Sequence, residues 1–455
     1  MVHIRSMIIS SNCAIVCLTM QPTLTKVSDV PATMESETES PLLTEEEVLS
    51  ILSKKLSQKF DLVEYNLRPL NSTNGFLGLY YGLTTLVKID GATKEHKFFM
   101  KAQPSKRSPQ FDLLVAAKGS EKESAMYTEI IPRMGNGKSC SGWSAECYLT
   151  KENVLVLDDL FAQGYVTTDK YVPFDHNHCL VVLRSLARFH AGSFIIDEKL
   201  KSKDTSLFEV YGDILGESLY NDSGISTRML SSCILGTMSL IDLLQEELSE
   251  SERAEFKERV RPWGENKEEL LNPSKKYRNV ICHRDLWANN LMLKYDASGK
   301  PEHCCLIDLQ VLRYNPPATD CVFLLYLTTD RETREKHGES LLRMYYETLD
   351  KELTNAGLDS RRCLDWPTFR KSCDDTRSLA MVYAFMNLPV MLLHPDMIKK
   401  QFNDSPELLN ESLYNDRSSV VCNQFFNVKQ YRERMTEVLL EAYEFLPRYA
   451  ESIKP

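Results

Sequence analysis

The chain has 455 residues, of which 43% are hydrophobic and 26% charged, and its formal net charge is −10 at a pI near 5.6. This composition is ordinary for a globular protein of two or three domains. The acidic balance argues against nucleic acid or an anionic membrane surface as the main partner, because both need clustered Lys and Arg. The 13 cysteines form no CxxC pairs, which argues against a disulfide framework or a zinc module and favours buried thiols in a reducing compartment.

Residues 1–43 are expected to be a disordered or mis-called N-terminal extension. An apolar stretch from Met7 to Met20 faintly resembles a signal peptide, but polar residues at positions 10–12 interrupt it. Met34 offers a natural alternative start, and the acidic segment that follows it is expected to be solvated. No run approaches the roughly 18 consecutive apolar residues that a transmembrane helix needs, so we expect a cytoplasmic protein without a membrane partner.

Order is expected to begin at Thr44, which forms a capping-box signature with the glutamate three residues later. The apolar periodicity that follows predicts an amphipathic helix from Glu45 to Lys59. Two strands, at 83–89 and 96–103, are predicted around an Asp-Gly turn. Gly75 and Gly78 precede the first strand, and glycines in such a turn let backbone N–H groups approach phosphate oxygens. We assign both to nucleotide binding, although a glycine-bearing hairpin is weak evidence alone.

Lys101 lies inside the return strand, where an unpaired ammonium group would be costly to bury. Glu123, in the predicted helix 119–131, is its candidate partner. Such a pair holds the α- and β-phosphates of ATP in kinases, so we assign both residues to nucleotide binding. The alternative is a lysine that faces solvent on an edge strand.

The apolar run Val154 to Leu157 predicts another short buried strand, which Asp158, Asp159 and Leu160 follow. In a two-lobed kinase the connector between the lobes lies at this point, and its backbone N–H and C=O groups bind adenine. We assign these three residues to the nucleotide site through their backbone, so the two carboxylates need not touch the ligand.

From Asn177 the pattern is helical almost to the end of the chain. His190 lies near the end of the apolar stretch from Cys179 to Ala191, and we expect a core histidine with a hydrogen-bonded ring there rather than a catalytic base. His176 and His178 lie in a polar turn, and we expect solvent exposure there rather than a metal site.

The strongest chemical signal lies between Val280 and Gln310. The tripeptide H-R-D at 283–285 is followed, after four residues, by Asn290, which is the H-R-D-x-x-x-x-N spacing of kinase catalytic loops. A phosphoryl acceptor needs a carboxylate to take its proton, and Mg²⁺ needs hard oxygen ligands close by. We therefore assign Asp285 as the catalytic base and Asn290 as a catalytic metal ligand.

Asp308 ends the buried strand predicted at 304–308 and is the second candidate metal ligand of the catalytic set. A hairpin between 291–295 and 304–308 would bring Asn290 and Asp308 side by side. Each motif alone could arise by chance, but two strand-flanked motifs in the right order are much harder to explain in that way.

Asp320 has two compatible explanations. It could cap the apolar helix predicted from Cys321 to Leu327, or its buried carboxylate could hold the catalytic-loop backbone around His283.

Together these residues resemble the ecdysteroid kinase-like family, also called CHK kinase-like, a relative of choline kinases and aminoglycoside phosphotransferases within the protein-kinase-like fold. The resemblance covers about residues 45–450. Its most specific part is Asp285-Leu286-Trp287 with Asn289-Asn290. The other matching elements are Phe99 to Lys101, Glu123 to Pro132, Val154 to Leu160, Leu186 to Ala191 and Leu306 to Gln310.

The resemblance implies an α+β, two-lobed fold with a small β-rich N-lobe at 44–157 and a large, mainly helical C-lobe at 158–455. It implies that Asp285 is the base, that Asn290 and Asp308 bind Mg²⁺, and that Glu123 orients Lys101 toward the phosphates.

Three positions depart from the family pattern. The family usually has Gly in place of Arg284, Phe in place of Leu309, and Glu in place of Asp158. None of these changes removes a group that performs chemistry, but Arg284 bears on activity because it can alter the loop backbone.

The predicted function is an ATP- and Mg²⁺-dependent kinase that phosphorylates the hydroxyl group of a small, largely apolar alcohol. The resemblance implies an ecdysteroid or a related alcohol. The alternatives are a choline- or ethanolamine-type kinase and a catalytically silent small-molecule-binding protein. A protein kinase fits less well because D-F-G and A-P-E are missing and only eleven residues separate Asp308 from Asp320. No obligate protein partner is expected.

Overall fold

The computed structural model describes residues 42–70, 78–134, 142–152, 154–218, 224–265, 272–400 and 405–452. The predicted phosphate-binding Gly75 lies outside the described residues, as does all but the last two residues of the predicted N-terminal extension.

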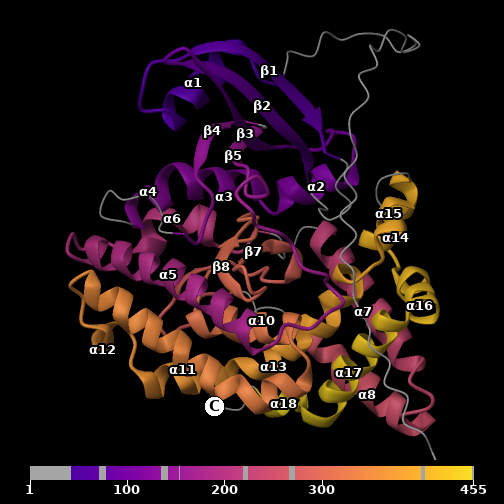
Figure 1. Ribbon diagram of the computed structural model, residues 1–455. Helices are drawn as coiled ribbons and strands as arrows, with labels where there is room; N and C mark the ends of the chain where they lie inside the picture. Colours follow the sequence, from indigo (N-terminus) through magenta and orange to yellow (C-terminus); the bar gives the residue numbers. More distant parts are fainter. Residues whose placement is uncertain are drawn as a thin grey trace, which may run out of the picture. The chain divides into compact units, whose positions relative to one another are not determined.

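The N-terminal lobe is built on a five-stranded antiparallel sheet with the strand order β1-β2-β3-β5-β4 (Figure 1). The elements of this lobe are α1 (Glu45–Lys55), β1 (Asp61–Pro69), β2 (Leu79–Ile89), β3 (Ala92–Ala102), α2 (Pro109–Ala116), α3 (Gly119–Ala125), a π-helical turn (Met126–Ile130), α4 (Ile131–Met134), β4 (Cys147–Lys151) and β5 (Val154–Asp158).

Helix α1 covers one face of this sheet. Its side chains Val48, Ile51 and Leu52 share a small apolar core with Phe98 and Met100 of β3. Successive side chains of a strand point to opposite faces, so the same strand presents Lys101 on the other side, toward the rest of the protein. The predicted capping box of Thr44 and Glu47 is confirmed.

The C-terminal lobe is mainly helical and contains two small two-stranded antiparallel sheets, β6 with β9 and the hairpin of β7 with β8. Its elements are α5 (His176–Lys201), α6 (Leu207–Leu215), α7 (Gly224–Asp242), α8 (Glu250–Glu265), β6 (Val280–Cys282), a 3₁₀ turn (Ala288–Asn290), β7 (Leu291–Tyr295), β8 (Pro301–Leu306), β9 (Arg313–Asn315), α10 (Pro317–Thr328), α11 (Arg331–Asn355), α12 (Ser360–Cys363), α13 (Trp366–Met391), α14 (Pro395–Ile398), α15 (Pro406–Tyr414), α16 (Ser418–Asn427), α17 (Lys429–Phe445) and α18 (Tyr449–Ser452).

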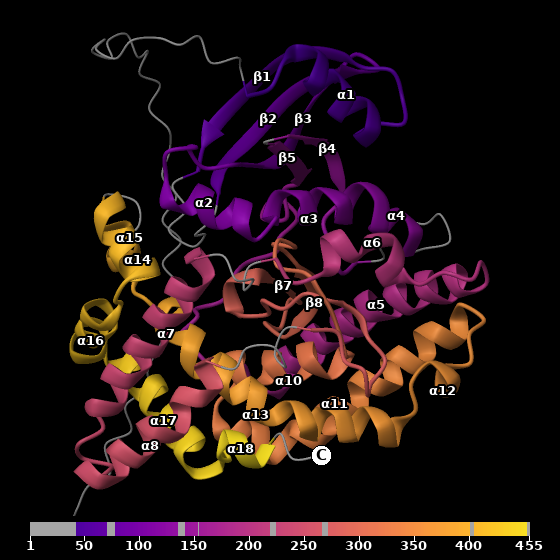
Figure 2. The same ribbon diagram turned by 180° about the vertical axis from the view of Figure 1, so that it is seen from behind.

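The largest apolar core joins the helices of this lobe to its two small sheets. Helices α5 and α11 run side by side, and α10 packs on α13 (Figure 2). Leu155 and Leu157 of β5 belong to the same core, so the two lobes share apolar packing. Among the described residues, α5 alone is long and apolar enough to cross a membrane, but 78% of its most apolar window is buried inside the fold.

A second apolar contact joins α2 of the N-lobe to α7 and α15. Ala117, Met229 and Tyr414 form its buried centre. The Tyr414 hydroxyl donates a hydrogen bond of 3.1 Å to the carbonyl oxygen of Pro109, which begins α2. The last part of the sequence therefore holds the N-terminal lobe directly.

These observations confirm the predicted α+β, two-lobed fold and correct several predicted elements. The first helix ends at Lys55 rather than Lys59, because the backbone is extended from Leu56 onward. Strand β1 was not predicted. The predicted helix 119–131 is interrupted by a π-helical turn, and the helix expected to begin after Asp320 begins at Pro317.

Candidate active site

The predicted catalytic-loop residues lie together between β6 and β7. The amide nitrogen Nδ2 of Asn290 donates to the carbonyl oxygen of Asp285 at 2.9 Å and to its carboxylate oxygen Oδ2 at 2.8 Å. Both bonds use the amide nitrogen, which leaves the amide oxygen of Asn290 as the donor atom for a cation. The side chain that fixes the proposed base thus presents a hard ligand at the same place.

The predicted hairpin is confirmed, with Leu291 of β7 opposite Leu306 of β8. The backbone N–H of Ile307 donates to the carbonyl oxygen of Asn290 at 3.1 Å, which brings Asp308 next to the catalytic loop. Strand β8 ends at Leu306, two residues earlier than predicted, and Asp308 has a left-handed backbone with φ of 67°. This turn directs the carboxylate away from the strand line and toward β3.

Lys101 joins the hairpin to the N-lobe. Its Nζ lies 2.8 Å from Glu123 Oε2 and 2.7 Å from Asp308 Oδ1, and the residue is 9% exposed. Strand β3 lies between β2 and β5, so Lys101 is not on an edge strand. Burial alone would lower the pKa of Lys101, but the carboxylates of Asp308 and Glu123 outweigh burial and raise it, so the amine stays charged.

Further contacts tie Glu123 of α3 and Lys101 of β3 to the segment from Asp308 to Gln310. Glu123 Oε1 accepts the backbone N–H of Leu309 at 3.2 Å. In the amide orientation that satisfies both partners, Gln310 donates to Asp308 Oδ1 at 3.1 Å and accepts from Lys101 Nζ at 3.0 Å. Sequence reasoning did not select Gln310 as a site residue, although it lies two positions after Asp308.

Lys122, the neighbour of Glu123, is fully buried and was also missed. Its Nζ donates to the carbonyl oxygen of Leu312 at 3.1 Å and to that of Gly216 at 3.3 Å. Burial is the main cause that lowers the pKa of this amine to about 6, and the nearby charge of Arg313 adds to it. A lysine beside a glutamate on a helix reads as a surface residue, so the sequence held no signal for this position.

The carboxyl group of Asp285 is suited to accept a proton near neutral pH. Burial and the neighbouring carboxylate of Asp308 raise its pKa to about 7, against the opposing hydrogen bond from Asn290. A pKa close to the working pH is the optimum for a general base.

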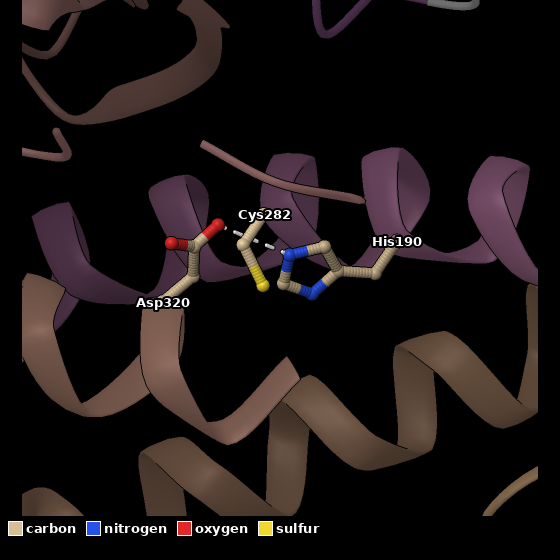
Figure 3. Close-up of side chains that lie close together, drawn as sticks. All are labelled: His190, Cys282 and Asp320. Carbon is tan, nitrogen blue, oxygen red and sulfur yellow. Dashed lines mark hydrogen bonds and ion pairs between the residues drawn. The ribbon is translucent and has the colours of Figure 1, made fainter. Parts of the chain in front are cut away.

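The catalytic-loop backbone is anchored by a buried group of three side chains, His190, Cys282 and Asp320 (Figure 3). The Asp320 carboxylate accepts the backbone N–H groups of His283 at 2.6 Å and Arg284 at 2.9 Å. Asp320 lies inside the first turn of α10 and does not cap it. Of its two explanations, the one that agrees with its contacts is that it holds the backbone around His283. Burial alone would raise the pKa of Asp320, but its hydrogen bonds keep it below the usual value.

The ring of His190 is buried and bonded at both nitrogens, as the core interpretation predicts. Nδ1 lies 2.6 Å from the Tyr345 hydroxyl, and Nε2 lies 3.2 Å from Asp320 Oδ2, the contact drawn in Figure 3. The thiol of Cys282 points to the carbonyl oxygen of Asn315 at 3.3 Å, and burial raises its pKa far above the ordinary value. A protonated thiol is a poor metal ligand, so this trio is a structural support.

The side chains of the predicted connector at 158–160 make contacts within the protein. Asp158 accepts from Lys55 at 2.6 Å and from the Tyr148 hydroxyl at 2.9 Å, and Asp159 accepts the backbone N–H of Ala162 at 3.0 Å. Part of the backbone is also used internally. The Asp158 N–H donates to Glu146, and the Leu160 carbonyl oxygen accepts from residues 163 and 165.

Gly78 lies just before β2, next to the end of β3. A Cβ built on this residue would lie 3.3 Å from the ring of Tyr80 and 3.4 Å from the carbonyl oxygen of Ala102, so a larger side chain would be crowded here. Burial, with the nearby charges of Asp308 and Glu123, raises the pKa of Tyr80 to about 12, and Lys101 opposes this shift.

Both histidines at the start of α5 are partly buried, which departs from the exposed positions expected for them. His178 contacts Asp175 at 2.7 Å and the Tyr295 hydroxyl at 3.1 Å. The ring of His176 lies 4.6 Å from that of His337. In the described ranges, the trio of Figure 3 is the one group close enough to hold a metal, so neither histidine belongs to such a group.

A cavity of about 480 Å³ borders Lys101, Glu123 and Gln310 from the side of α2 and the β4–β5 turn. Its lining does not include Asp285, Asn290 or Asp308 among the described residues. The cavity therefore lies behind the charged pair rather than at the catalytic loop.

Comparisons with known proteins give a family and several solved structures. A family model described as the ecdysteroid kinase-like family matches residues 74–358. A search of curated proteins finds no match. Among solved structures, an ethanolamine kinase from Plasmodium vivax has a TM-score of 0.34 at 13% identity, with 86% of each chain covered.

Two other solved structures match at similar levels. A choline/ethanolamine kinase family protein from Mesorhizobium loti has a TM-score of 0.34 at 14% identity, covering 82% of this chain and 92% of that one. The microcompartment-associated aminopropanol kinase has a TM-score of 0.36 at 12% identity, covering 86% of this chain and 99% of that one. Because the family model spans more than half of the sequence, this chain belongs to the ecdysteroid kinase-like family and is a phosphotransferase with an alcohol group as its acceptor.

Proposed function

We propose that this protein uses ATP and Mg²⁺ to phosphorylate a hydroxyl group on a small, largely apolar molecule, with an ecdysteroid or a related steroid alcohol as the preferred acceptor. One observation supports the proposal most strongly. Lys101 lies between Glu123 and Asp308, and the hairpin brings this set to the Asn290–Asp285 pair. These are the groups that phosphoryl transfer to an alcohol requires.

The proposed base is Asp285. An alcohol is a weak nucleophile, and a carboxylate that takes its proton as the phosphorus–oxygen bond forms makes the attack easier. The hydrogen bond from Asn290 Nδ2 fixes one carboxylate oxygen, so the other is directed at the acceptor. Asp320 keeps the loop in place through the two backbone N–H groups before the base.

The donor set fits Mg²⁺. The residues that would hold the ion are Asp308, which is 29% exposed at its side chain, and Asn290 through its amide oxygen. Carboxylate and carbonyl oxygens are the ligands that this hard cation prefers. The bound nucleotide supplies the phosphoryl group, and the ion offsets the negative charge of its oxygens.

Lys101 is proposed to contact the phosphates. Its ammonium group is already charged and buried, and Glu123 fixes its direction from α3. The second contact of Lys101, with Asp308, also orients the proposed metal ligand. Gly78 leaves space for backbone approach at the entrance to the site.

The acceptor is inferred from the family. The family name points to ecdysteroids. Choline and ethanolamine remain the main alternative acceptors. A cytoplasmic location is proposed as well, since the cysteines in the described part of the chain are all free thiols, as a reducing compartment allows.

The test is transfer of label from γ-labelled ATP with Mg²⁺ to a panel of an ecdysteroid, other steroid alcohols, choline, ethanolamine and a protein substrate. Labelled steroid product from the wild type, and none from Asp285→Asn, is the expected result. Transfer to choline or ethanolamine alone would replace the steroid acceptor and keep the kinase. ATP–Mg²⁺ binding without turnover on any alcohol would favour a catalytically silent binding protein. Transfer to protein alone would overturn the proposal.

A further inference from the structure

Arg284 immediately precedes the proposed base and has an unusual backbone. Its φ is +70°, in the left-handed region where L side chains are crowded and glycine is preferred. Only five non-glycine residues in the described ranges share a positive φ, and Arg284 is the longest side chain among them together with Lys118. A chain that keeps an arginine at such a position must compensate through its side-chain contacts.

Those contacts are with aromatic rings under the catalytic loop. The guanidinium carbon lies 4.8 Å from the ring centre of Phe323 and 5.9 Å from that of Tyr383. The two ring centres lie 4.7 Å apart with a tilt of 31°, so the rings pack against each other and the guanidinium group lies beside this aromatic pair. Nη1 also donates to Asn315 Oδ1 at 3.3 Å, and Arg284 is 7% exposed.

The same aromatic pair is tied to the loop itself. The Tyr383 hydroxyl donates to the carbonyl oxygen of Arg284 at 2.9 Å, at the peptide that continues into Asp285. The cation site beside the rings therefore belongs to the residue next to the group proposed to take the acceptor proton. A molecule held by these rings could place a nearby hydroxyl at that base.

Aromatic rings are also the usual means of holding a quaternary ammonium group. In this protein the guanidinium group of Arg284 occupies the position beside the rings of Phe323 and Tyr383. A second cation brought next to it would meet a like charge in a buried environment, where repulsion is strong. Excluding an unwanted substrate by an unfavourable charge is a standard source of specificity.

We propose that Arg284 is a specificity-determining residue: by occupying the aromatic cation site beside the base, it makes the enzyme select alcohols without a positive charge and reject choline-like acceptors. This inference rests on the proposed kinase function and narrows its acceptor class. Arg284 acts through charge and space, and it has no role in moving the proton.

The test compares two acceptors of the same shape, choline and its uncharged carbon analogue 3,3-dimethylbutan-1-ol. Their ratio of kcat/KM is measured for the wild type, Arg284→Gly, Arg284→Met and Arg284→Lys. Arg284→Gly suits the backbone and empties the site, Arg284→Met fills it without charge, and Arg284→Lys keeps the charge. Arg362→Met, which removes a highly exposed arginine of α12, is the matched control.

The expected result is a choline preference that rises about tenfold or more in Arg284→Gly and Arg284→Met, mainly through KM for choline. The ratio should stay within about twofold of wild type in Arg284→Lys and Arg362→Met, since both keep the local cation. An unchanged ratio in the two uncharged variants, or a wild type that already prefers choline, overturns the inference.

Failure of this inference can be told apart from failure of the proposed kinase function. If the wild type labels no alcohol, the kinase proposal fails, and calorimetric affinities for choline and its analogue are compared across the same variants. Choline affinity that rises relative to the analogue in the uncharged variants still supports the inference, and equal changes for both ligands contradict it. ATP–Mg²⁺ binding and the melting temperature of each variant show that it is folded.

Discussion

Asp320 and His283 are joined across 37 residues of sequence by a hydrogen bond of 2.6 Å from the His283 backbone N–H to the Asp320 carboxylate. The same carboxylate takes the next N–H along the chain, that of Arg284. One side chain of α10 thus fixes the backbone just before the proposed base, so stability and catalysis depend on the same buried group.

Replacing Asp320 with asparagine is expected to lower both the stability of the protein and its catalytic activity. The variant loses a charged acceptor for two buried N–H groups, which costs about 2–4 kcal/mol of unfolding free energy. We expect kcat to fall at least about tenfold because the loop is displaced, while nucleotide affinity changes little. Denaturant unfolding and steady-state kinetics measure this, with Glu332→Gln on exposed α11 surface as the control. Wild-type kcat in a destabilised variant would limit Asp320 to a structural role.

Asp285→Asn is expected to lower turnover by roughly 10²–10⁴, the usual range for loss of a general base. ATP–Mg²⁺ binding should stay near wild type, because asparagine keeps the contact with Asn290. The melting temperature should not fall, because the variant removes a carboxylate that is costly to bury. Turnover within a factor of two of wild type would refute the assignment of the base.

The pH dependence of kcat/KM should show the ionisation of the Asp285 carboxyl group. A raised pKa means that Asp285 still carries its proton at pH values where a free aspartate is ionised, and only the ionised form can act as a base. Activity of the free enzyme should therefore rise with pH and level off above about 7. The slope should be missing from the residual activity of Asp285→Asn. A profile that is flat between pH 5 and 8 (roughly the range in which such a group titrates) would contradict it.

Asp308→Ala is expected to abolish Mg²⁺-dependent nucleotide binding. The neutral amide oxygen of Asn290 cannot by itself hold the ion against water. The change also removes one of the two ion-pair partners of Lys101, so some stability is lost as well. Calorimetry of ATP binding with and without Mg²⁺ measures the effect, and Glu302→Ala on the exposed side of β8 is the control. If ATP binding by the variant still depends on Mg²⁺ as in the wild type, the metal site lies elsewhere.

Lys122→Met is expected to change how stability depends on pH. The folded-state pKa of about 6 lies below that of the unfolded chain, so between these two values the unfolded state binds more protons. Wild-type stability therefore rises as the pH increases from about 6 toward 10, and the full cost of burying the charge persists below pH 6.

The methionine variant should lack this rise, so its stability relative to wild type is greatest near pH 6 and falls at alkaline pH. Unfolding in denaturant at several pH values measures it. Parallel curves for the two proteins would show that Lys122 keeps an ordinary pKa.

The sequence predicted the parts of the fold that depend on local patterns. The capping box at Thr44, the β7–β8 hairpin and the short strand β5 follow from signals within a few residues. Strand β1 lacks such a signal, because most of its side chains are exposed and its pairing with β2 is decided in three dimensions.

The candidate site also divides into residues with a local sequence signal and residues whose role depends on distant contacts. Asp285, Asn290 and Asp308 carry a recognisable spacing. Gln310 and Lys122 do not, because each has a partner from a distant segment: Lys101 for Gln310, and Leu312, 190 residues away, for Lys122. The two explanations of Asp320 could be separated only when the true start of α10 was known.

The contact between Tyr414 and Pro109 has a practical consequence for work with shorter pieces of this protein. The family match ends at Leu358, but the helices beyond it supply Tyr383 under the catalytic loop and Tyr414 against the N-lobe. A fragment trimmed to the matched range would expose the apolar seam around Met229 and Ala117 to water. Such a fragment would be prone to aggregate, and inactivity in it would say nothing about the catalytic groups that it still contains.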